Sequence, residues 1–123
     1  MHDLAGYQFE ERRSIYRPIG EATPGELSDM MTEALALAIE HGATAVLINI
    51  TAMHGFSSPG PAYRRWLIRR WAALVADRLR VALVVREEHL CPERTGLIIA
   101  AEEGMKANIF VAEAEALTWL NCG

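Results

Sequence analysis

Two mainly hydrophobic runs dominate the pattern along this chain: 45–50, in which Asn49 is the one polar residue, and 81–85. Neither run alternates between apolar and polar positions. Strands of this kind are typical of the centre of a sheet that is covered on both faces. The segment between them, 61–78, has helical periodicity. A strand, a helix and a second strand in this order predict a right-handed crossover unit with parallel strands.

The helix before the first of these strands has clear start and stop signals. Thr23 is suited to cap its first turn, Pro24 fits the first helical position, and Glu26 completes a capping box. Gly42 is the expected stop. One face of the helix is apolar and is expected to pack on the sheet; it carries Leu27, Met31, Ala34 and Ala38.

Shorter elements complete the pattern on both sides of this centre. We expect two strands within 7–19, a third helix from Pro92 to near Gly104, a strand at 108–111 and a closing helix at 114–120. The expected order is β-β-α-β-α-β-α-β-α. This is an α/β fold with a mixed sheet of about five strands and about four helices. A chain of 123 residues suits one domain, residues 1–123.

Composition and charge argue against several classes of function. A hydrophobic content of 51% indicates a folded core, and a net charge of −4 argues against a nucleic-acid partner. Cys91 and Cys122 do not have the spacing of a metal or redox motif. The N-terminus lacks the features of a signal peptide, and no apolar run approaches the roughly 20 residues that cross a bilayer. We therefore expect a cytoplasmic protein with no transmembrane segment.

Arginines are concentrated in the middle of the chain, since eight of the twelve basic residues are arginines within 64–94. On the helix at 61–78, one arc carries Trp66 among several of them, and such a group is typical of partner contacts. A cation–π pair without any partner is the alternative. The charged arc consists of Arg65, Trp66, Arg69, Arg70 and Asp77. The opposite arc is expected to face the sheet and consists of Tyr63, Leu67, Trp71, Leu74 and Val75.

Three stretches at the joints of this pattern resemble one known family. The first stretch has a strand end, a glycine and a capped helix start, and reads IGEATPGELSDMM. The second stretch has a buried strand and a serine-containing loop before a helix, and reads AVLINITAMHGFSSPG. The third has the last strand and the terminal helix, and reads NIFVAEAEALTWL. Together they resemble the SpoIIAA-like branch of the STAS fold, named for sulfate transporters and antagonists of anti-sigma factors. The resemblance implies a non-enzymatic regulatory or protein-interaction module.

The serine-containing loop carries the family's regulatory feature in altered form. In regulatory members, a partner kinase phosphorylates a serine in a loop reading Asp-Ser-Ser-Gly, which follows a strand that ends in Asp. Here Asn49 stands in place of that Asp, Ser57 replaces the acidic loop residue and Pro59 replaces the second serine, while Ser58 and Gly60 keep the pattern. The resemblance makes Ser58, with Ser57, the phospho-acceptor candidate.

A phosphoryl group on Ser58 would have a physical basis. It would add negative charge at a helix N-terminus, where unsatisfied amides and the positive end of the helix dipole stabilise anions. The alternative is that Ser58 only caps the helix, which is worth about 1 kcal/mol.

The expected interaction surface is the loop at 51–60 together with the charged arc of the following helix. Its partner would be a kinase or another regulator, or a second copy of the chain in a homodimer. A small apolar or lipid-like ligand stays open as well, because some relatives of this fold are compared with lipid-binding domains of the Sec14 type. The candidate residues are Asn49, Thr51, His54, Phe56, Arg65, Trp66, Arg69 and Arg70.

The stretch REEHLCPER is the one place with residues suited to catalysis or metal binding. His89 and Cys91 follow a central strand, with Glu87, Glu88 and Glu93 beside them. A cysteine and a histidine could form a nucleophilic pair or a mixed metal site. However, the two lie very close in sequence, and no three-ligand spacing is present. We expect no catalytic residue, no metal and no cofactor, with a weak hydrolase or metal site at 87–93 as an alternative.

Overall fold

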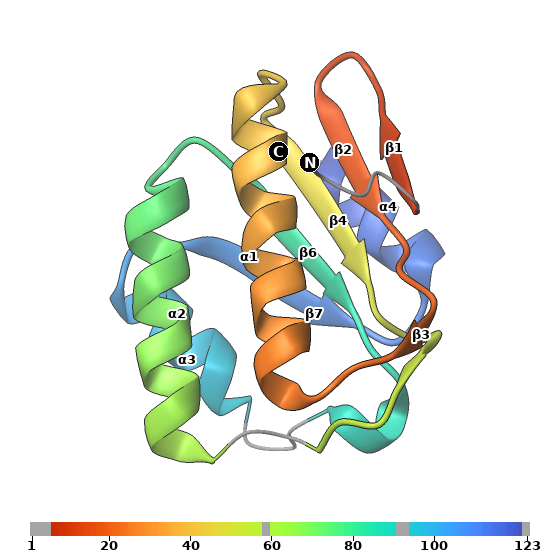
Figure 1. Ribbon diagram of the computed structural model, residues 1–123. Helices are drawn as coiled ribbons and strands as arrows, with labels where there is room; N and C mark the ends of the chain where they lie inside the picture. The colour runs from red at the N-terminus through yellow and green to blue at the C-terminus, as the bar shows by residue number, and fades with distance from the viewer. Residues whose placement is uncertain (1–5, 58–59, 91–93, 122–123) are drawn as a thin grey trace.

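A five-stranded sheet forms the centre of the molecule (Figure 1). The computed structural model describes residues 6–57, 60–90 and 94–121. The strands lie in the order β1-β2-β4-β6-β7; β1 is antiparallel to β2, and the other neighbours are parallel. Their bounds are Tyr7–Phe9 for β1, Arg13–Tyr16 for β2, Ala45–Asn49 for β4, Arg80–Val84 for β6 and Lys106–Phe110 for β7.

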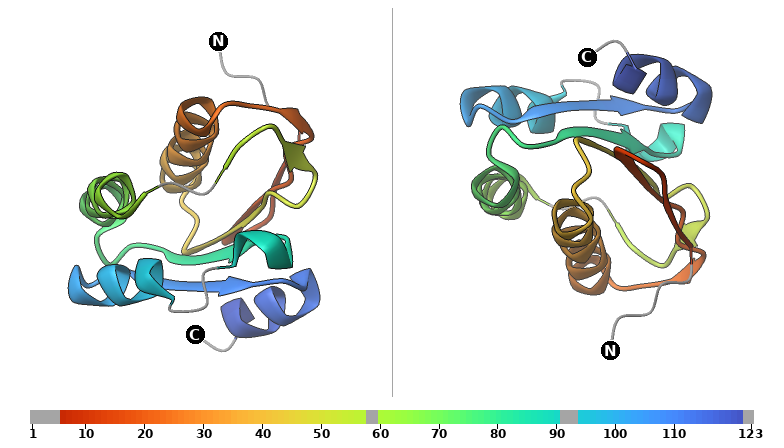
Figure 2. Two further views of the ribbon diagram at one scale, coloured as in Figure 1. Left: turned by 90° about the horizontal axis from the view of Figure 1, so that it is seen from below. Right: turned by 90° about the horizontal axis from the view of Figure 1, so that it is seen from above.

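The helices cover both faces of this sheet. Figure 2 shows α1 and α2 on one side and α4 on the other, and α3 packs beside β7. Their bounds are Pro24–Glu40 for α1, Pro61–Val75 for α2, Thr95–Glu102 for α3 and Glu113–Asn121 for α4. The predicted fold class, a mixed sheet of five strands with four helices in the expected order, is confirmed.

The uninterrupted apolar strands feed two separate cores. Val46 and Ile48 of β4 point into the larger core, beneath α1, whereas Leu47 points into a smaller core beneath α4. All three are almost fully buried. Successive side chains of a strand point to opposite faces, so a strand covered on both faces needs an apolar residue at every position.

The capping box predicted for α1 is present. The Thr23 side chain accepts a hydrogen bond from the Glu26 backbone nitrogen at 3.1 Å, and the Glu26 carboxylate accepts one from the Thr23 nitrogen at 2.9 Å. Both backbone N–H groups lack partners inside the helix, so these bonds fix the start of α1.

The structure corrects the predicted end of α2 and adds three short elements. Helix α2 ends at Val75 rather than at 78, because Ala76 has a φ of 48°, which no helix continues through. Helix α3 begins at Thr95, whereas its predicted start at Pro92 lies outside the described residues. The added elements are a small parallel pair, β3 (Gly20–Glu21) with β5 (Met53–His54), and a 3₁₀ turn, η1 (Glu87–His89).

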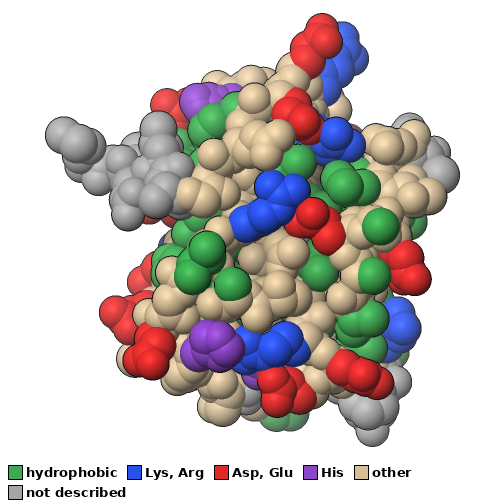
Figure 3. Space-filling view, turned by 90° about the vertical axis from the view of Figure 1, so that its right-hand side faces the viewer, with side chains coloured by type: hydrophobic (Ala, Val, Ile, Leu, Met, Phe, Trp, Pro, Cys, Tyr) green, Lys and Arg blue, Asp and Glu red, His purple; other side chains and the backbone are tan. Residues whose placement is uncertain are grey.

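The surface on the β1–β2 side is mixed in character. Figure 3 shows acidic and basic side chains interspersed there, with hydrophobic atoms scattered between them. None of the helices in the described part of the chain is both long enough and apolar enough to span a membrane.

Candidate functional site

A cavity lies between helix α2 and the sheet. No Cα atom of α2 comes within 8 Å of a strand Cα in the described residues, because α2 packs on α1 and α3 instead. The space has a volume of about 200 Å³. Residues of helices α1, α2 and α3 and of the parallel strands β4, β6 and β7 line it. Its apolar lining includes Leu27, Met31, Leu35, Ile48, Ile50, Leu67, Ile68, Val81, Leu83, Leu97, Ala100, Met105, Ala107 and Ile109.

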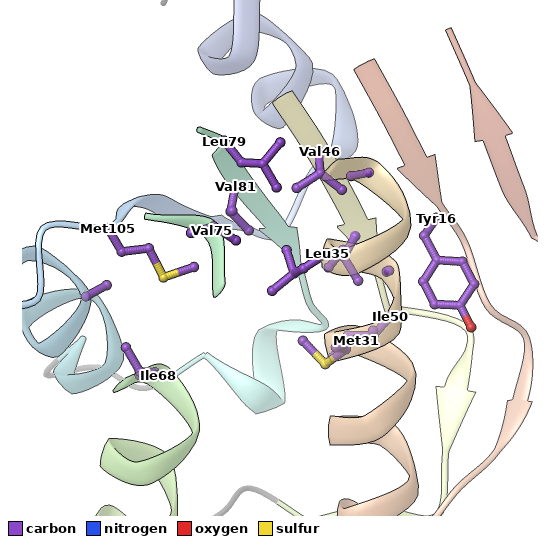
Figure 4. Close-up of a cluster of buried hydrophobic side chains, with 14 of the residues drawn as sticks. Tyr16, Met31, Leu35, Val46, Ile50, Ile68, Val75, Leu79, Val81 and Met105 are labelled. Atoms are coloured by element: carbon purple, nitrogen blue, oxygen red, sulfur yellow. The ribbon is translucent and has the colours of Figure 1, made fainter. Parts of the chain in front are cut away.

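Side chains from several distant parts of the sequence meet around this space. Figure 4 shows Met31 and Leu35 on α1, Ile68 on α2, and Val81 on β6. Met105, just before β7, reaches the same region. The sheet and the helices therefore form the cavity wall together, from residues that lie far apart in the sequence.

Two side-chain hydrogen bonds join α2 to α1. The Tyr63 hydroxyl donates to Ser28 Oγ at 3.0 Å, and the Trp71 indole Nε1–H donates to Thr32 Oγ1 at 2.8 Å. Ser28 and Thr32 in turn donate to α1 carbonyls, those of Pro24 and Ser28 respectively. The predicted inward arc of α2 therefore contacts α1 and faces the cavity, and its Val75 reaches the larger core.

A group of polar side chains lines the end of the cavity near the carboxyl end of β6. The His89 ring lies 4.5 Å from the Phe56 ring, centroid to centroid, with a tilt of 30°. Its Nδ1 atom is buried and has no hydrogen-bond partner in the described structure. Arg64 and Arg94 also lie on the wall. Phe56, a candidate from the sequence, is thus part of the cavity rather than of an open loop surface.

The charged arc of α2 is exposed, with Trp66 at its centre. Trp66 is 53% exposed, stacks on Tyr63 at 5.6 Å and lies under the Arg70 guanidinium at 5.5 Å. Arg65 and Arg69 form surface ion pairs with the end of α3 and its cap, to Glu102 at 3.8 Å and Glu103 at 3.1 Å. Exposed pairs of this kind contribute little to stability. The structure therefore brings together these four predicted residues on one accessible helix face.

Asn49 and Thr51 take part in a hydrogen-bond network inside the protein. Asn49 Oδ1 accepts from the Thr51 backbone nitrogen and hydroxyl at 3.0 and 2.7 Å. Asn49 Nδ2 donates to the Glu113 carboxylate, which also receives two hydrogen bonds from Arg17, at 2.8 and 3.0 Å. The hydrogen bond from Arg17 lowers the pKa of Glu113 below its ordinary value, and the same bond raises the pKa of Arg17. This network ties β2, β4 and α4 together.

His54 is held by Arg86. Arg86 Nη1 donates to the backbone oxygens of Thr51 and Met53, both at 2.8 Å, and lies 3.3 Å from His54 Nδ1. His54 is exposed on β5, so it is accessible, but it lies with the strand-end network and not with the arc on α2. The eight candidate interaction residues therefore fall into three groups: the network, the cavity end and the exposed arc.

The remaining candidates are placed only in part. Ser57 is exposed and belongs to the cavity lining, while Ser58 lies outside the described residues. Cys91 and Glu93 also lie outside them. Among the residues that are described, no group of three or more His, Cys, Asp or Glu side chains could hold a metal ion.

Sequence reasoning missed most of the cavity wall. It assigned Leu27 and Met31 to the core and treated His89 as a loop residue. One clue was available: the small residues Ala100 and Ala107 lie on α3 and β7, two elements that pack together. Small residues on facing elements leave space between them, yet the pattern alone does not show where that space lies.

A comparison with solved structures bears on the fold. No family model and no curated protein matches the chain. A crystal structure of an uncharacterised protein from Shewanella loihica PV-4, of the DUF3478 family and described as having a SpoIIAA-like fold, matches with a TM-score of 0.53 and 20% identity. The match covers 94% of this chain and 90% of the other.

The chain has a SpoIIAA-like fold. The resemblance inferred from the three sequence stretches is therefore confirmed at the level of the fold. Within the SpoIIAA-like fold of this chain, the cavity beneath α2 and the exposed arc of the same helix are the two features that a binding function could use.

Proposed function

We propose that this SpoIIAA-like domain is a non-enzymatic binding domain that takes a small apolar ligand into the cavity beneath α2. The cavity itself is the observation that carries the proposal. Protein interiors are packed as densely as organic crystals and contain few voids larger than a water molecule. A space of about 200 Å³ with a mainly apolar wall is therefore unusual in a domain of 123 residues.

The size of the cavity limits the ligand. An apolar cavity of about 150 Å³ in another protein stays dry and binds benzene. Drug-sized ligands occupy pockets of about 300–1,000 Å³. A space of about 200 Å³ therefore suits a molecule somewhat larger than benzene and smaller than a typical drug.

An empty cavity also leaves its apolar wall without the van der Waals contacts that a packed interior provides. A ligand that fills the space would supply these contacts, and larger side chains at Ala100 or Ala107 would remove the space.

A pair of neighbouring substitutions tests the proposal. Ala100 is buried on the cavity wall, whereas Ala101 is exposed and lies off it. We expect small apolar compounds such as toluene, indole and 1-octanol to raise the melting temperature of the unmodified protein. Ala100→Phe should weaken this binding at least tenfold by occupying the space, whereas Ala101→Phe should leave it unchanged. Isothermal titration calorimetry provides the dissociation constants.

The proposal fails if none of these compounds binds and native mass spectrometry of gently purified protein finds it empty. It also fails if Ala100→Phe folds and binds them as well as Ala101→Phe does. If Ala100→Phe does not fold, Ala107→Leu, a smaller change at another wall position, replaces it as the test variant.

A second function, contact with a protein partner, is favoured by the exposure of Trp66. Tryptophan and arginine are enriched at the energetic centres of interfaces, and Trp66 lies between Tyr63 and Arg70 on an accessible face. The partner would be a regulator or a second copy of the chain. A phosphoryl group at Ser57 or Ser58, just before α2, would change the surface that the partner meets.

The double substitution Trp66→Ala/Arg69→Ala tests this second function. Both side chains are largely exposed, so we expect a change of less than about 1 kcal/mol in the free energy of unfolding. Self-association in light scattering, or capture of a partner from the native host, should fall at least tenfold. Arg78→Ala, at an exposed position beyond the end of α2, is the control. Association unaltered by the double substitution would exclude this face.

A further inference from the structure

We propose that the ligand of this cavity is a small carboxylate with an apolar body, and that His89 and Arg94 bind its carboxylate group. This inference rests on the proposed function and names the chemical class of the ligand. It starts from the polar atoms on the wall, because a mainly apolar cavity selects its ligand through the few polar groups that it contains.

Most polar groups on the α1 and α2 sides of the wall already have partners. Ser28 accepts from Tyr63 and donates to the Pro24 carbonyl, and the Trp71 indole donates to Thr32. These bonds join two helices and leave little capacity for a ligand. The polar atoms that could select a ligand must therefore lie elsewhere on the wall.

Among the described residues of this wall, His89 has the one fully buried side-chain polar atom that the structure leaves without a hydrogen-bond partner. Its Nδ1 is buried and makes no hydrogen bond. A buried polar group without a partner costs about 1–3 kcal/mol, and native structures contain few of them. The His89 ring lies tilted against Phe56. Nδ1 has no accessible surface in this conformation, so a ligand oxygen would reach it through a turn of the ring.

The charges on the wall favour a negatively charged ligand. The described lining contains three basic side chains, Arg64, His89 and Arg94, and no acidic one. This is notable in a chain with a net charge of −4. Carboxylates form charge-assisted hydrogen bonds with arginine and histidine, and these are stronger than bonds between neutral groups.

The position of this group in the fold agrees with a ligand head group. His89 follows the carboxyl end of β6 and Arg94 precedes α3. Ligands in open α/β sheets bind outside the carboxyl ends of the strands. The apolar body would extend from there among Ile68, Leu83 and Ala100, within the volume of about 200 Å³. The Nδ1–H form of His89 would donate to one carboxylate oxygen, and Arg94 would supply the opposite charge.

A comparison of octanoate with 1-octanol tests the inference. The two share an alkyl chain, and at pH 7 only octanoate carries a charge. We expect His89→Phe, which keeps an aromatic ring against Phe56, to weaken octanoate binding roughly tenfold or more, because a hydrogen bond to a charged group is lost. Binding of 1-octanol should change less than threefold. Arg94→Gln should also weaken octanoate more than 1-octanol, and His41→Phe, at an exposed position on another face, should change neither.

The outcomes separate this inference from the proposed function. If both compounds bind the unmodified protein equally well, or if His89→Phe weakens both equally, the carboxylate assignment is wrong and the apolar cavity site stands. If neither binds, and the neutral apolar compounds do not bind either, the proposed function fails. Nitrogen-15 NMR of the histidine rings in the unmodified protein needs no variant: octanoate should shift the His89 Nδ1 resonance and 1-octanol should not. An unshifted resonance at saturating octanoate overturns the inference.

Discussion

Leu47→Ala is expected to lower the free energy of unfolding by about 2–5 kcal/mol. Leu47 is fully buried at the centre of β4, the middle strand of the sheet. Its side chain packs into the smaller core beneath α4, where the alanine would leave a cavity that the surrounding backbone cannot close. That core also contains Ile15, Ala82, Val84, Ala116 and Leu120.

Urea denaturation followed by circular dichroism measures this loss. The slope of the transition should stay the same, since the substitution changes stability and not the extent of unfolding. Ile19→Ala removes similar apolar atoms at a position that is 85% exposed, and it should cost less than about 0.5 kcal/mol. A loss below about 1 kcal/mol for Leu47→Ala would mean that α4 does not pack on the sheet as described.

Trp71→Ala is expected to cost about 3 kcal/mol, near the lower end of the range for removing a large aromatic side chain, because Trp71 is only partly buried. The indole packs α2 against α1 and donates a hydrogen bond to Thr32 Oγ1. Helix α2 has no close backbone contact with the strands in the described structure, so its attachment depends on α1 and α3.

Two further variants separate the contributions of Trp71. Trp71→Phe keeps most of the packing and loses the indole N–H, so it should cost about 1 kcal/mol. Trp66→Ala removes the same kind of side chain from the exposed arc of the same helix and should cost less than about 1 kcal/mol. Thermal and urea unfolding of the three variants provide the comparison. Equal losses for Trp71→Ala and Trp66→Ala would contradict the described orientation of α2.

The local signals in the sequence were sufficient for the main elements. Thr23, Pro24 and Glu26 specify the start of α1 through contacts within four residues, so no distant part of the chain is needed to recognise it. The runs of apolar residues in β4 and β6 indicated cover on both faces, and the two cores supply it. The parallel pairing of β4 with β6 was predicted from the crossover through α2.

The features that sequence reasoning missed depend on distances between elements. A helical wheel gives the direction in which Trp71 or Leu67 points, but not how far the helix lies from the sheet. The cavity beneath α2 was therefore not predictable as a volume. The pair β3–β5 has two residues in each strand, which is too short for any periodic pattern. The end of α2 has no glycine or proline to mark it, and only the conformation of Ala76 shows it.

The hydrogen bond between Asn49 and Glu113 makes these two positions interdependent. Asn49 Nδ2 lies 3.2 Å from a carboxylate oxygen of Glu113. An aspartate at position 49 would face a second carboxylate at this distance, and the two negative charges would repel each other. Arg17 could compensate only one of them. Homologous chains that carry an aspartate at this strand end should therefore lack an acid at the start of the last helix, and the two residues should covary.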